Sequence, residues 1–505
     1  MLDKNFDQLS DQEFDLYLED MMDAPPPAEL SDEITPWRSA MNRILWGTVW
    51  TTITLNFWYL DVILSATGHV MQLLGFRALR RENRWFRLGY GLCWLRCIWW
   101  ILNFGINCTI YSGTPEIERI LSAAAYVMLV PGFLLLMALR NGVRTVQQKA
   151  GLPPHGGNGI LVCFCLMVFF ATAKLGGIAA WGLMIVYVCI LRNLFTLSKE
   201  LDEAGYAVSP APVRISDSAL KRTCTAVILL VLVVGLCFFD SYRMDWQPVT
   251  ASENAEVMDV RQELLKLGFP EHIMDDLNEE DLLSCKGAKR IVVDMEDHPV
   301  NNGREVGEQT SMGLHLYTVY DQKELRITGI AVELPGEPVR WKIIHHFQWV
   351  IDPGFRGTEV LHLWPAYRKG NGWNSAGELS GQVLYDHDGQ VFSAPFYSLG
   401  QETYTQNSIF WGQQTSTDVF AEFSLPSKGE NHRGYVSYTI AEVQDGWSID
   451  AWINYTHQTP WPQYPVITAK EKQQTMGVGD TRTFKTVQDA LQFFPGDENP
   501  VPFGD

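Results

Sequence analysis

The sequence predicts a polytopic membrane protein with about seven spanning helices, a short helical hairpin and then an all-β sandwich that could be a jelly roll. Three observations lead to this fold class. Apolar runs long enough to cross a bilayer fill residues 37–240. Apolar residues recur at helical spacing over 255–285, and from about residue 290 their period changes to two.

Charge divides the chain at similar places. The net formal charge is −10 over residues 1–36, +9 over 37–240 and −18 over 241–505. A basic, apolar middle between acidic flanks is typical of a membrane unit that carries soluble parts. The acidic flanks argue against nucleic acid as a partner, because phosphate binding needs clustered Lys and Arg.

These patterns define five expected domains. The first combines acidic runs with "APPPAEL", a composition typical of disorder. The domains are a disordered acidic cytoplasmic tail (1–36), a transmembrane helical domain (37–240), a helical hairpin linker (241–289), a β-sandwich (290–470) and a C-terminal tail with a short helix (471–505).

A spanning helix needs about 20 mostly apolar residues. Single spans are expected at 88–111, 121–139 and around 226–239. The runs 41–79 and 158–197 are each about twice that length, so each is expected to form a helical hairpin. The first should turn near 56–61 and the second near 171–177.

Basic loops give an orientation. The stretch "FRALRRENRWFR" (76–87) holds five arginines and one glutamate, and loops rich in Lys and Arg stay in the cytoplasm. The basic loops 139–151 and 191–222 fall on the same side by this count. The N-terminus is then cytoplasmic and the β-domain extracytoplasmic. If 158–197 spanned only once, the β-domain would lie in the cytoplasm.

Cysteine usage favours a bacterial plasma membrane. Eight of the nine cysteines lie between positions 93 and 237, and Cys285 alone lies in the C-terminal domain. That domain therefore has no internal disulfide, whereas a secreted animal domain of its size would usually carry some.

The β-domain is expected to contain nine strands separated by Gly, Pro, Asn and Asp. The segments are "GLHLYTVYD", "ELRITGIAVEL", "VRWKIIHHFQWVID", "EVLHLWPAY", "GQVLYD", "GQVFSAPFYS", "DVFAEFSLP", "RGYVSYTIAEV" and "WSIDAWINYT". A final segment, "TVQDALQFF" (486–494), is expected to be a helix.

Two motifs in the β-domain have structural explanations. His345 and His346 are neighbours on one expected strand, so they face opposite sides and cannot bind one metal together. His345 is expected to be a hydrogen-bonded core histidine, and His346 a metal ligand only with help from elsewhere. In "YDHDGQ" (385–390), Asp-Gly between two strands predicts a hairpin turn rather than a calcium loop.

The strand "SIDAWINYT" supplies the candidate ligand-binding residues. Asp450, Trp452 and Asn454 share one face of it. A tryptophan flanked by hydrogen-bonding groups on an exposed sheet face can stack on a sugar ring or a peptide. The alternative is that Trp452 belongs to the core, because aromatic side chains dominate burial.

The sequence therefore favours a non-enzymatic function. It contains no Walker loop, GxSxG elbow, HExxH motif or dinucleotide fingerprint, and no cofactor or metal is predicted. The expected function is binding or sensing of an external ligand or envelope protein from a bilayer anchor. A transporter or its accessory subunit is one alternative, and would need a polar cavity lined by His69, Asn103 or Asn107. An external hydrolase is the other, and would need a concave cluster of His and carboxylates.

Overall fold

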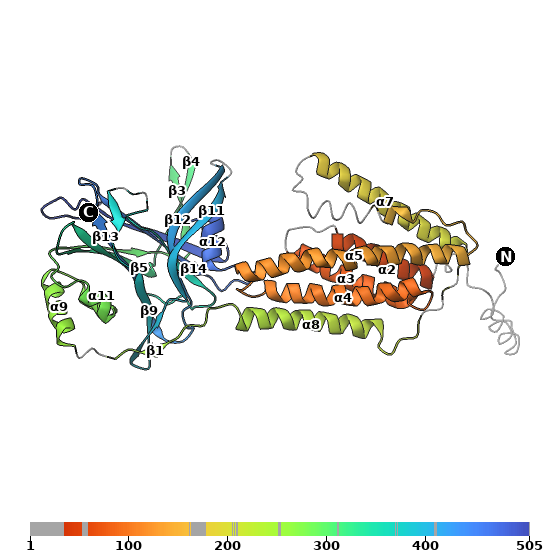
Figure 1. Cartoon of the computed structure of the whole chain (residues 1–505), viewed down its shortest axis with the longest axis horizontal. Coiled ribbons are helices and arrows are strands. Elements are labelled where there is room, and N and C mark those ends of the chain that lie inside the picture. The colour runs from red at the N-terminus through yellow and green to blue at the C-terminus, as the bar shows by residue number, and fades with distance from the viewer. Residues whose placement is uncertain are drawn as a thin grey trace. The chain divides into compact units, whose positions relative to one another are not determined.

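A computed structural model describes most of the chain (Figure 1). The described residues are 35–503 except 53–58, 161, 163–177, 205, 207, 209–210, 251–253, 311–312, 369, 371 and 409–411. The acidic tail predicted at 1–36 lies almost wholly outside this set. The chain forms two compact units, Met1–Asn103 with Ile120–Ile228, and Phe104–Arg119 with Leu229–Asp505.

Long helices dominate the first half of the chain. They are α2 (Pro36–Thr52), α3 (Leu60–Leu79), α4 (Arg84–Asn107), α5 (Pro115–Lys149), α7 (Ile178–Glu203) and α8 (Asp217–Phe238). Within the described residues, three of them are long and apolar enough to cross a membrane, namely α3, α5 and α8. The structure therefore supports three candidate spans and not the expected seven.

The two predicted hairpins are described in part. Helices α2 and α3 pack along each other. Helix α2 ends at Thr52 and α3 begins at Leu60, within the range 56–61 where the first turn was expected, and residues 53–58 lie outside the described residues. The second turn, at 171–177, lies outside the described residues. Pro131 sits inside α5 without ending it, as membrane helices allow.

Glycines bring α2 and α3 close together. A Cβ on Gly47 would lie 2.7 Å from the carbonyl oxygen of Gly68, and one on Gly75 would lie 2.6 Å from that of Ala40. Small residues at such contacts let helix backbones approach, which is a common way for membrane helices to pack.

The second half of the chain is built on a β-sandwich. Its larger sheet has the order β1-β10-β9-β13-β6-β5-β2, with β8 beside β13. The strands are β1 (Gln247–Pro248), β2 (Ile291–His298), β5 (Leu325–Leu334), β6 (Arg340–Trp349), β8 (Trp373–Ser375), β9 (Ser380–His387), β10 (Gln390–Pro395) and β13 (Glu430–Glu442).

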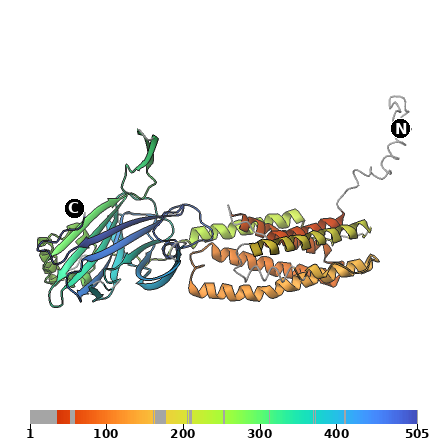
Figure 2. The same cartoon turned by 90° about the horizontal axis from the view of Figure 1, so that it is seen from above.

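The smaller sheet has the order β11-β12-β7-β14-β15. Its strands are β7 (Glu359–Trp364), β11 (Ser398–Ser408), β12 (Gly412–Phe423), β14 (Ile449–Gln458) and β15 (Phe484–Phe493). One apolar core, including Trp341, Phe347 and Phe423, fills the space between the sheets. A separate hairpin of β3 (Arg304–Thr310) and β4 (Gly313–Val319) stands out from the sandwich (Figure 2).

All nine expected strand segments contain strands, but the last element was predicted wrongly. Residues 484–493 form strand β15 rather than a helix, pairing along β14 from Ile449↔Phe493 to Gln458↔Phe484. Val487, Leu491 and Phe493 point into the core at strand spacing, so tertiary pairing overrides the helix propensity of Ala, Leu and Gln. The helix of this region is α12 (Ala469–Met476), which starts in a capping box of Thr468 and Glu471.

Three short helices cover the outer face of the larger sheet. They are α9 (Ala255–Lys266), α10 (Glu271–Met274) and α11 (Glu279–Leu283), in place of the expected two-helix hairpin. Val257, Leu264 and Ile273 pack with Ile344 of β6 in a second apolar cluster. Helices α9 and α11 lie side by side at this face (Figure 1).

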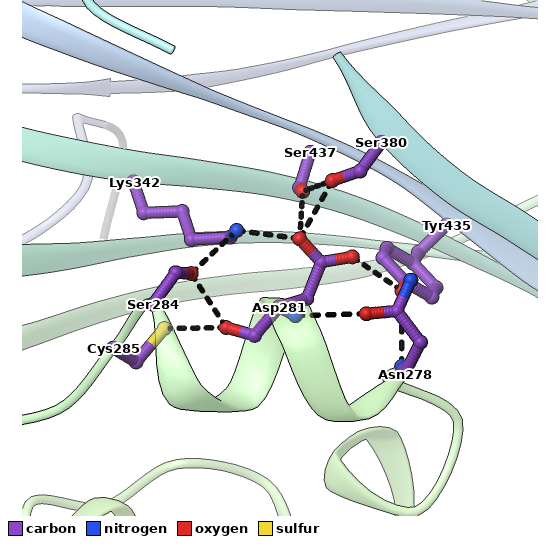
Figure 3. Close-up of polar contacts among 8 residues, drawn as sticks. All are labelled: Asn278, Asp281, Ser284, Cys285, Lys342, Ser380, Tyr435 and Ser437. Carbon is purple, nitrogen blue, oxygen red and sulfur yellow. Dashed lines mark hydrogen bonds and ion pairs between the residues drawn. The ribbon is translucent and has the colours of Figure 1, made fainter. Parts of the chain in front are cut away.

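Buried ion pairs fix these helices to the sheet. Lys342 Nζ lies 2.6 Å from Asp281 Oδ1, and Tyr435 OH donates to Asp281 Oδ2 at 2.6 Å (Figure 3). His346 Nε2 contacts Asp276 Oδ2 at 2.9 Å, and Arg433 contacts the other oxygen of Asp276 at 2.7 Å. His346 therefore has a structural partner, so it does not fit the metal role considered for it.

Candidate ligand-binding site

The outer face of the smaller sheet is covered over part of its area by α12. Val360 and Phe420 of the sheet form an apolar contact with Ala469 of the helix. Lys472 Nζ donates to Thr486 Oγ1 at 2.6 Å. Beyond the helix the strands keep a polar and aromatic face, and the sequence-predicted residues lie there.

Strand β14 places the three predicted residues differently. Asp450 is exposed, Trp452 is half-buried and Asn454 is fully buried. Trp452 Nε1 donates to Asp450 Oδ1 at 2.6 Å, which fixes the indole beside the carboxylate. Gln488 Nε2 donates to Asn454 Oδ1 at 2.8 Å. Asn454 is therefore occupied inside the protein, and its expected place at a binding surface is wrong.

A cavity of about 520 Å³ opens at Trp452. Its walls are Trp364, Pro365, Ala366, Arg368, Trp447, Ser448, Asp450 and Trp452. Trp364 stands opposite Trp452 in the strand register, and their ring centroids are 6.0 Å apart. Three indoles line this wall together with one cation, one carboxylate and the hydroxyl of Ser448. Such a mixture of aromatic and polar groups occurs in small-molecule sites.

Gly372 makes room for the third indole. It has a φ of +72°, and a Cβ on it would lie 2.6 Å from Cγ and Cδ1 of Trp447. A residue with a side chain would be strained at this φ and would also collide with the ring. Trp447 can therefore lie against the backbone and form one side of the cavity.

Arg368 joins the cavity to a buried polar cluster. Its guanidinium carbon lies 4.8 Å from the centroid of the Trp364 ring and its Nε lies 2.5 Å from Asp418 Oδ1. Asp418, which is fully buried, also accepts from Tyr404 OH at 2.7 Å and contacts His362 Nε2 at 2.9 Å. This cluster holds the guanidinium in a fixed position against the indole.

Burial controls the ionisation of the cluster. Desolvation lowers the pKa of His362 despite the neighbouring Asp418 carboxylate. Desolvation and the hydrogen bond to Asp418 both raise the pKa of Tyr404. At neutral pH the phenol stays protonated and donates to the carboxylate.

The sequence alone did not identify Trp364, Arg368 or Trp447. A usable signal was present in "EVLHLW", where His362 and Trp364 fall on the face opposite to Leu361 and Leu363. The cavity could not be foreseen because its walls come from segments about 80 residues apart, joined only by the register of β7 and β14.

The other motifs of the β-domain have structural roles. Asp388 and Gly389 have φ values of 51° and 77° between β9 and β10, which confirms the expected hairpin turn. His345 is fully buried, as expected, but neither ring nitrogen has a hydrogen-bond partner among the described residues. The expectation that it would be hydrogen-bonded was wrong.

In the helical half, His69, Gln72 and Arg96 form internal contacts. His69 Nδ1 lies 2.8 Å from the carbonyl oxygen of Ser65, one turn earlier in the same helix. Arg96 donates to Gln72, which donates in turn to Thr48. A cavity of about 420 Å³ in this half is lined mostly by apolar side chains of α2, α3 and α8, and His69 is not in its wall.

Comparison with known proteins gives no family for the chain. No family model matches it, and no curated protein does so either. A solved structure of AvmM, described as catalysing macrocyclization in alchivemycin A biosynthesis, resembles it with 12% sequence identity and a TM-score of 0.16, over 33% of this chain and 84% of that chain. A likeness of this size carries no argument about function.

Proposed function

We propose that the protein is a membrane-anchored binding protein that takes a neutral sugar into the tryptophan cavity on its β-domain. The observation that carries this proposal is the group of three indoles, Trp364, Trp447 and Trp452, around one cavity with Arg368 and Asp450 at its wall. It is a non-enzymatic function, in which the helical half serves as the anchor in the bilayer.

The chemistry of the cavity fits a sugar ring. An indole face offers a flat apolar surface for the C–H face of a pyranose. Hydroxyl groups need a donor and an acceptor at the edge of the ring, and Arg368 and Asp450 supply them. A neutral sugar fits better than an acidic one, because the domain from residue 241 carries a net charge of −18 and repels anions.

The buried cluster behind the cavity favours binding over hydrolysis. His362 and Asp418 are 2% and 0% exposed, and neither belongs to the cavity wall. A general base must come within hydrogen-bond reach of the proton that it removes. The mostly apolar cavity in the helical half, with a wall that lacks His69, likewise favours an anchor over a transporter.

A glycan array followed by calorimetry tests the function. The full chain would be purified in a detergent without a sugar headgroup, because an alkyl glycoside would compete for the cavity. Neutral oligosaccharides should bind, and Trp452→Ala should weaken binding about tenfold, since an aromatic contact contributes about 1–1.5 kcal/mol.

Trp461→Ala is the matched control for this experiment. Trp461 is a surface tryptophan, 49% exposed, that stacks with Arg482, and it lies outside the cavity wall. Its replacement should leave the affinity unchanged. Failure of every neutral glycan to bind, or equal affinity of Trp452→Ala and the native chain, would overturn the proposal.

We also infer that the β-domain lies outside a bacterial plasma membrane, with the N-terminus in the cytoplasm. The basic loop at 76–87 supports this orientation. Cys285 is only 1% exposed, so it cannot report sidedness in the folded protein. Ser427→Cys, at an exposed loop position, in a chain whose native cysteines are replaced, should react with an impermeant maleimide in intact cells. Reaction only after permeabilisation would place the domain inside.

A further inference from the structure

The edge strand β2 of the larger sheet carries charged side chains on the face that points into the sandwich. Glu296 pairs in register with Ile327, and His298 pairs with Leu325. Both of these partners belong to the core between the sheets. Residues paired in register point to the same face of a sheet. Glu296 and His298 therefore face the space between the two sheets at its open edge.

Strand β15, at the edge of the smaller sheet, brings a third ligand to the same place. Asp489 pairs with Ile453, which also belongs to the core. His298 Nε2 lies 3.2 Å from Asp489 Oδ2. One oxygen of Glu296, one oxygen of Asp489 and one ring nitrogen of His298 all lie within 4.8 Å of one another.

Within the described part of the chain, no Lys or Arg side chain balances the charge of this group. Among the described residues, no Lys or Arg forms an ion pair with Glu296 or Asp489. Arg326, the cation nearest in register, pairs instead with Asp297 on the other face of β2, at 2.7 Å. Two carboxylates that share one small site repel each other, and a single imidazole cannot neutralise both.

A second observation concerns the same space between the sheets. His345 pairs in register with Gly329 on β5, so its ring also faces the space between the sheets. It is fully buried, and both of its nitrogens lack a partner among the described residues. Burial lowers the pKa of His345 to about 4, and the one charge that opposes this is the carboxylate of Asp489. A fully buried imidazole with both nitrogens unpaired shows that the space between the sheets also holds a polar side chain without a partner among the described residues.

We propose that Glu296, His298 and Asp489 form a binding site for a divalent first-row transition ion such as Zn²⁺. One imidazole nitrogen and two carboxylate oxygens are a ligand set that suits such ions. Three protein ligands leave at least one position for water.

The ion would join the edge strands of opposite sheets. It would add a cross-link where the sandwich is open and would compensate two facing negative charges. The competing explanation is that inward charges on an edge strand only discourage pairing with another chain. That explanation predicts no bound ion, so the two can be distinguished.

Metal content and stability of the full chain test the proposal. The protein would be purified in detergent by a tag without histidines, stripped with a chelator, desalted and titrated with Zn²⁺. The native chain should retain one Zn²⁺ and should melt at a higher temperature with the ion, because a ligand that binds only the folded state stabilises it. Glu296→Gln and Asp489→Asn should lose both the ion and the temperature shift.

Asp297→Asn is the matched control, because it removes a carboxylate from the same strand on the opposite face. It should retain one Zn²⁺. Equal zinc content in all four proteins, or none in the native chain, would overturn the proposal. If the variants fail to fold, X-ray absorption of the zinc-loaded native chain decides. Nitrogen and oxygen ligands with one imidazole are expected, and sulfur ligands would refute the assignment.

Discussion

Lys342 Nζ lies 2.6 Å from Asp281 Oδ1, with side chains only 6% and 3% exposed, where strand β6 meets helix α11. Ser380 and Ser437 donate to the same oxygen of Asp281, and Ser284 accepts from the lysine (Figure 3). Every group of this cluster has a partner. The Lys342–Asp281 pair therefore fixes the helices to the sheet. Loss of either side chain would leave the other charge buried without a partner, which destabilises the fold.

Removing one member should release the helices from the sheet. Asp281→Ala leaves a buried lysine without a counter-ion, which costs about 3–5 kcal/mol. Cys285, one turn further on, is buried and should then react with a thiol reagent at least a hundredfold faster. Peptide-resolved mass spectrometry of labelled protein measures this rate. Lys286→Ala, which breaks an exposed pair with Glu256, should leave the rate unchanged, and a similar acceleration there would contradict the assignment.

Acid should have the same effect as this substitution. Burial alone would raise the pKa of Asp281, but Lys342 and the hydrogen bonds outweigh it, so the pKa lies below its ordinary value. The pKa of Asp276 is lowered in the same way, by His346 and Arg433 against the effect of burial. A carboxylate with a lowered folded-state pKa stabilises the fold above its unfolded pKa, and this contribution is lost as the pH falls through the folded value.

The labelling of Cys285 should therefore be constant from pH 7 to about pH 4 and rise only below it. A pyridyl disulfide that reacts at acid pH is the suitable reagent. A rise centred between pH 5 and 7 would show that some other group controls the contact.

The Arg368–Asp418 pair should show strong coupling. Arg368→Met leaves the fully buried Asp418 carboxylate with neutral partners, which should cost about 3 kcal/mol and lower the melting temperature by several degrees. The double variant Arg368→Met/Asp418→Asn removes the uncompensated charge and should recover most of the loss. Additive losses in the double variant would show that the two side chains act independently.

Two glycines test how the cavity wall is held. Gly370 and Gly372 both have positive φ values, of 61° and 72°, so alanine strains the backbone at either. Only the Cβ at position 372 would meet Trp447, because the Cβ at 370 has no atom within 4 Å. Gly372→Ala should raise the hydroxyl-radical oxidation of Trp447, and Gly370→Ala should not. Equal oxidation in both would mean that Gly372 does not position the ring.

The alternation of apolar and polar residues predicted the strand segments of the β-domain well, because a strand with one buried face keeps this period of two. It failed at 486–494, where Ala490 and Leu491 favour a helix in isolation and the ladder with β14 decides otherwise. In the helical half, the apolar runs form helices wherever the structure describes them, but residues 163–177 of the run 158–197 lie outside that part. Only three of the described helices have the length and composition of a membrane span, so the expected number of seven is not supported.

The sequence pointed to the part of the candidate site that lies on the single strand β14, and not to the wall residues from other segments. Asp450 and Trp452 share a face by alternation, and both line the cavity. The same alternation placed Asn454 on this face. It could not predict that β15 places Gln488 beside Asn454 and occupies its amide oxygen. The sequence alone singled out neither Asp276 nor Asp281. Their buried partners lie up to 157 residues away along the chain, where no local pattern reaches.

The separation between Asp276 and Arg433 sets an order of events during synthesis. Helices α10 and α11 leave the ribosome well before β13, which supplies Arg433, Tyr435 and Ser437. Until β13 is made, Asp276 and Asp281 lack the partners that this strand supplies. The apolar side of the helices then packs against a sheet that is still missing a strand. Domains with such long-range contacts fold slowly and expose apolar surface and unpaired strand edges while they fold. The nascent chain should therefore depend on holding factors, and a ribosome-bound chain stopped before residue 430 should be digested by protease at 255–285 while a completed chain resists.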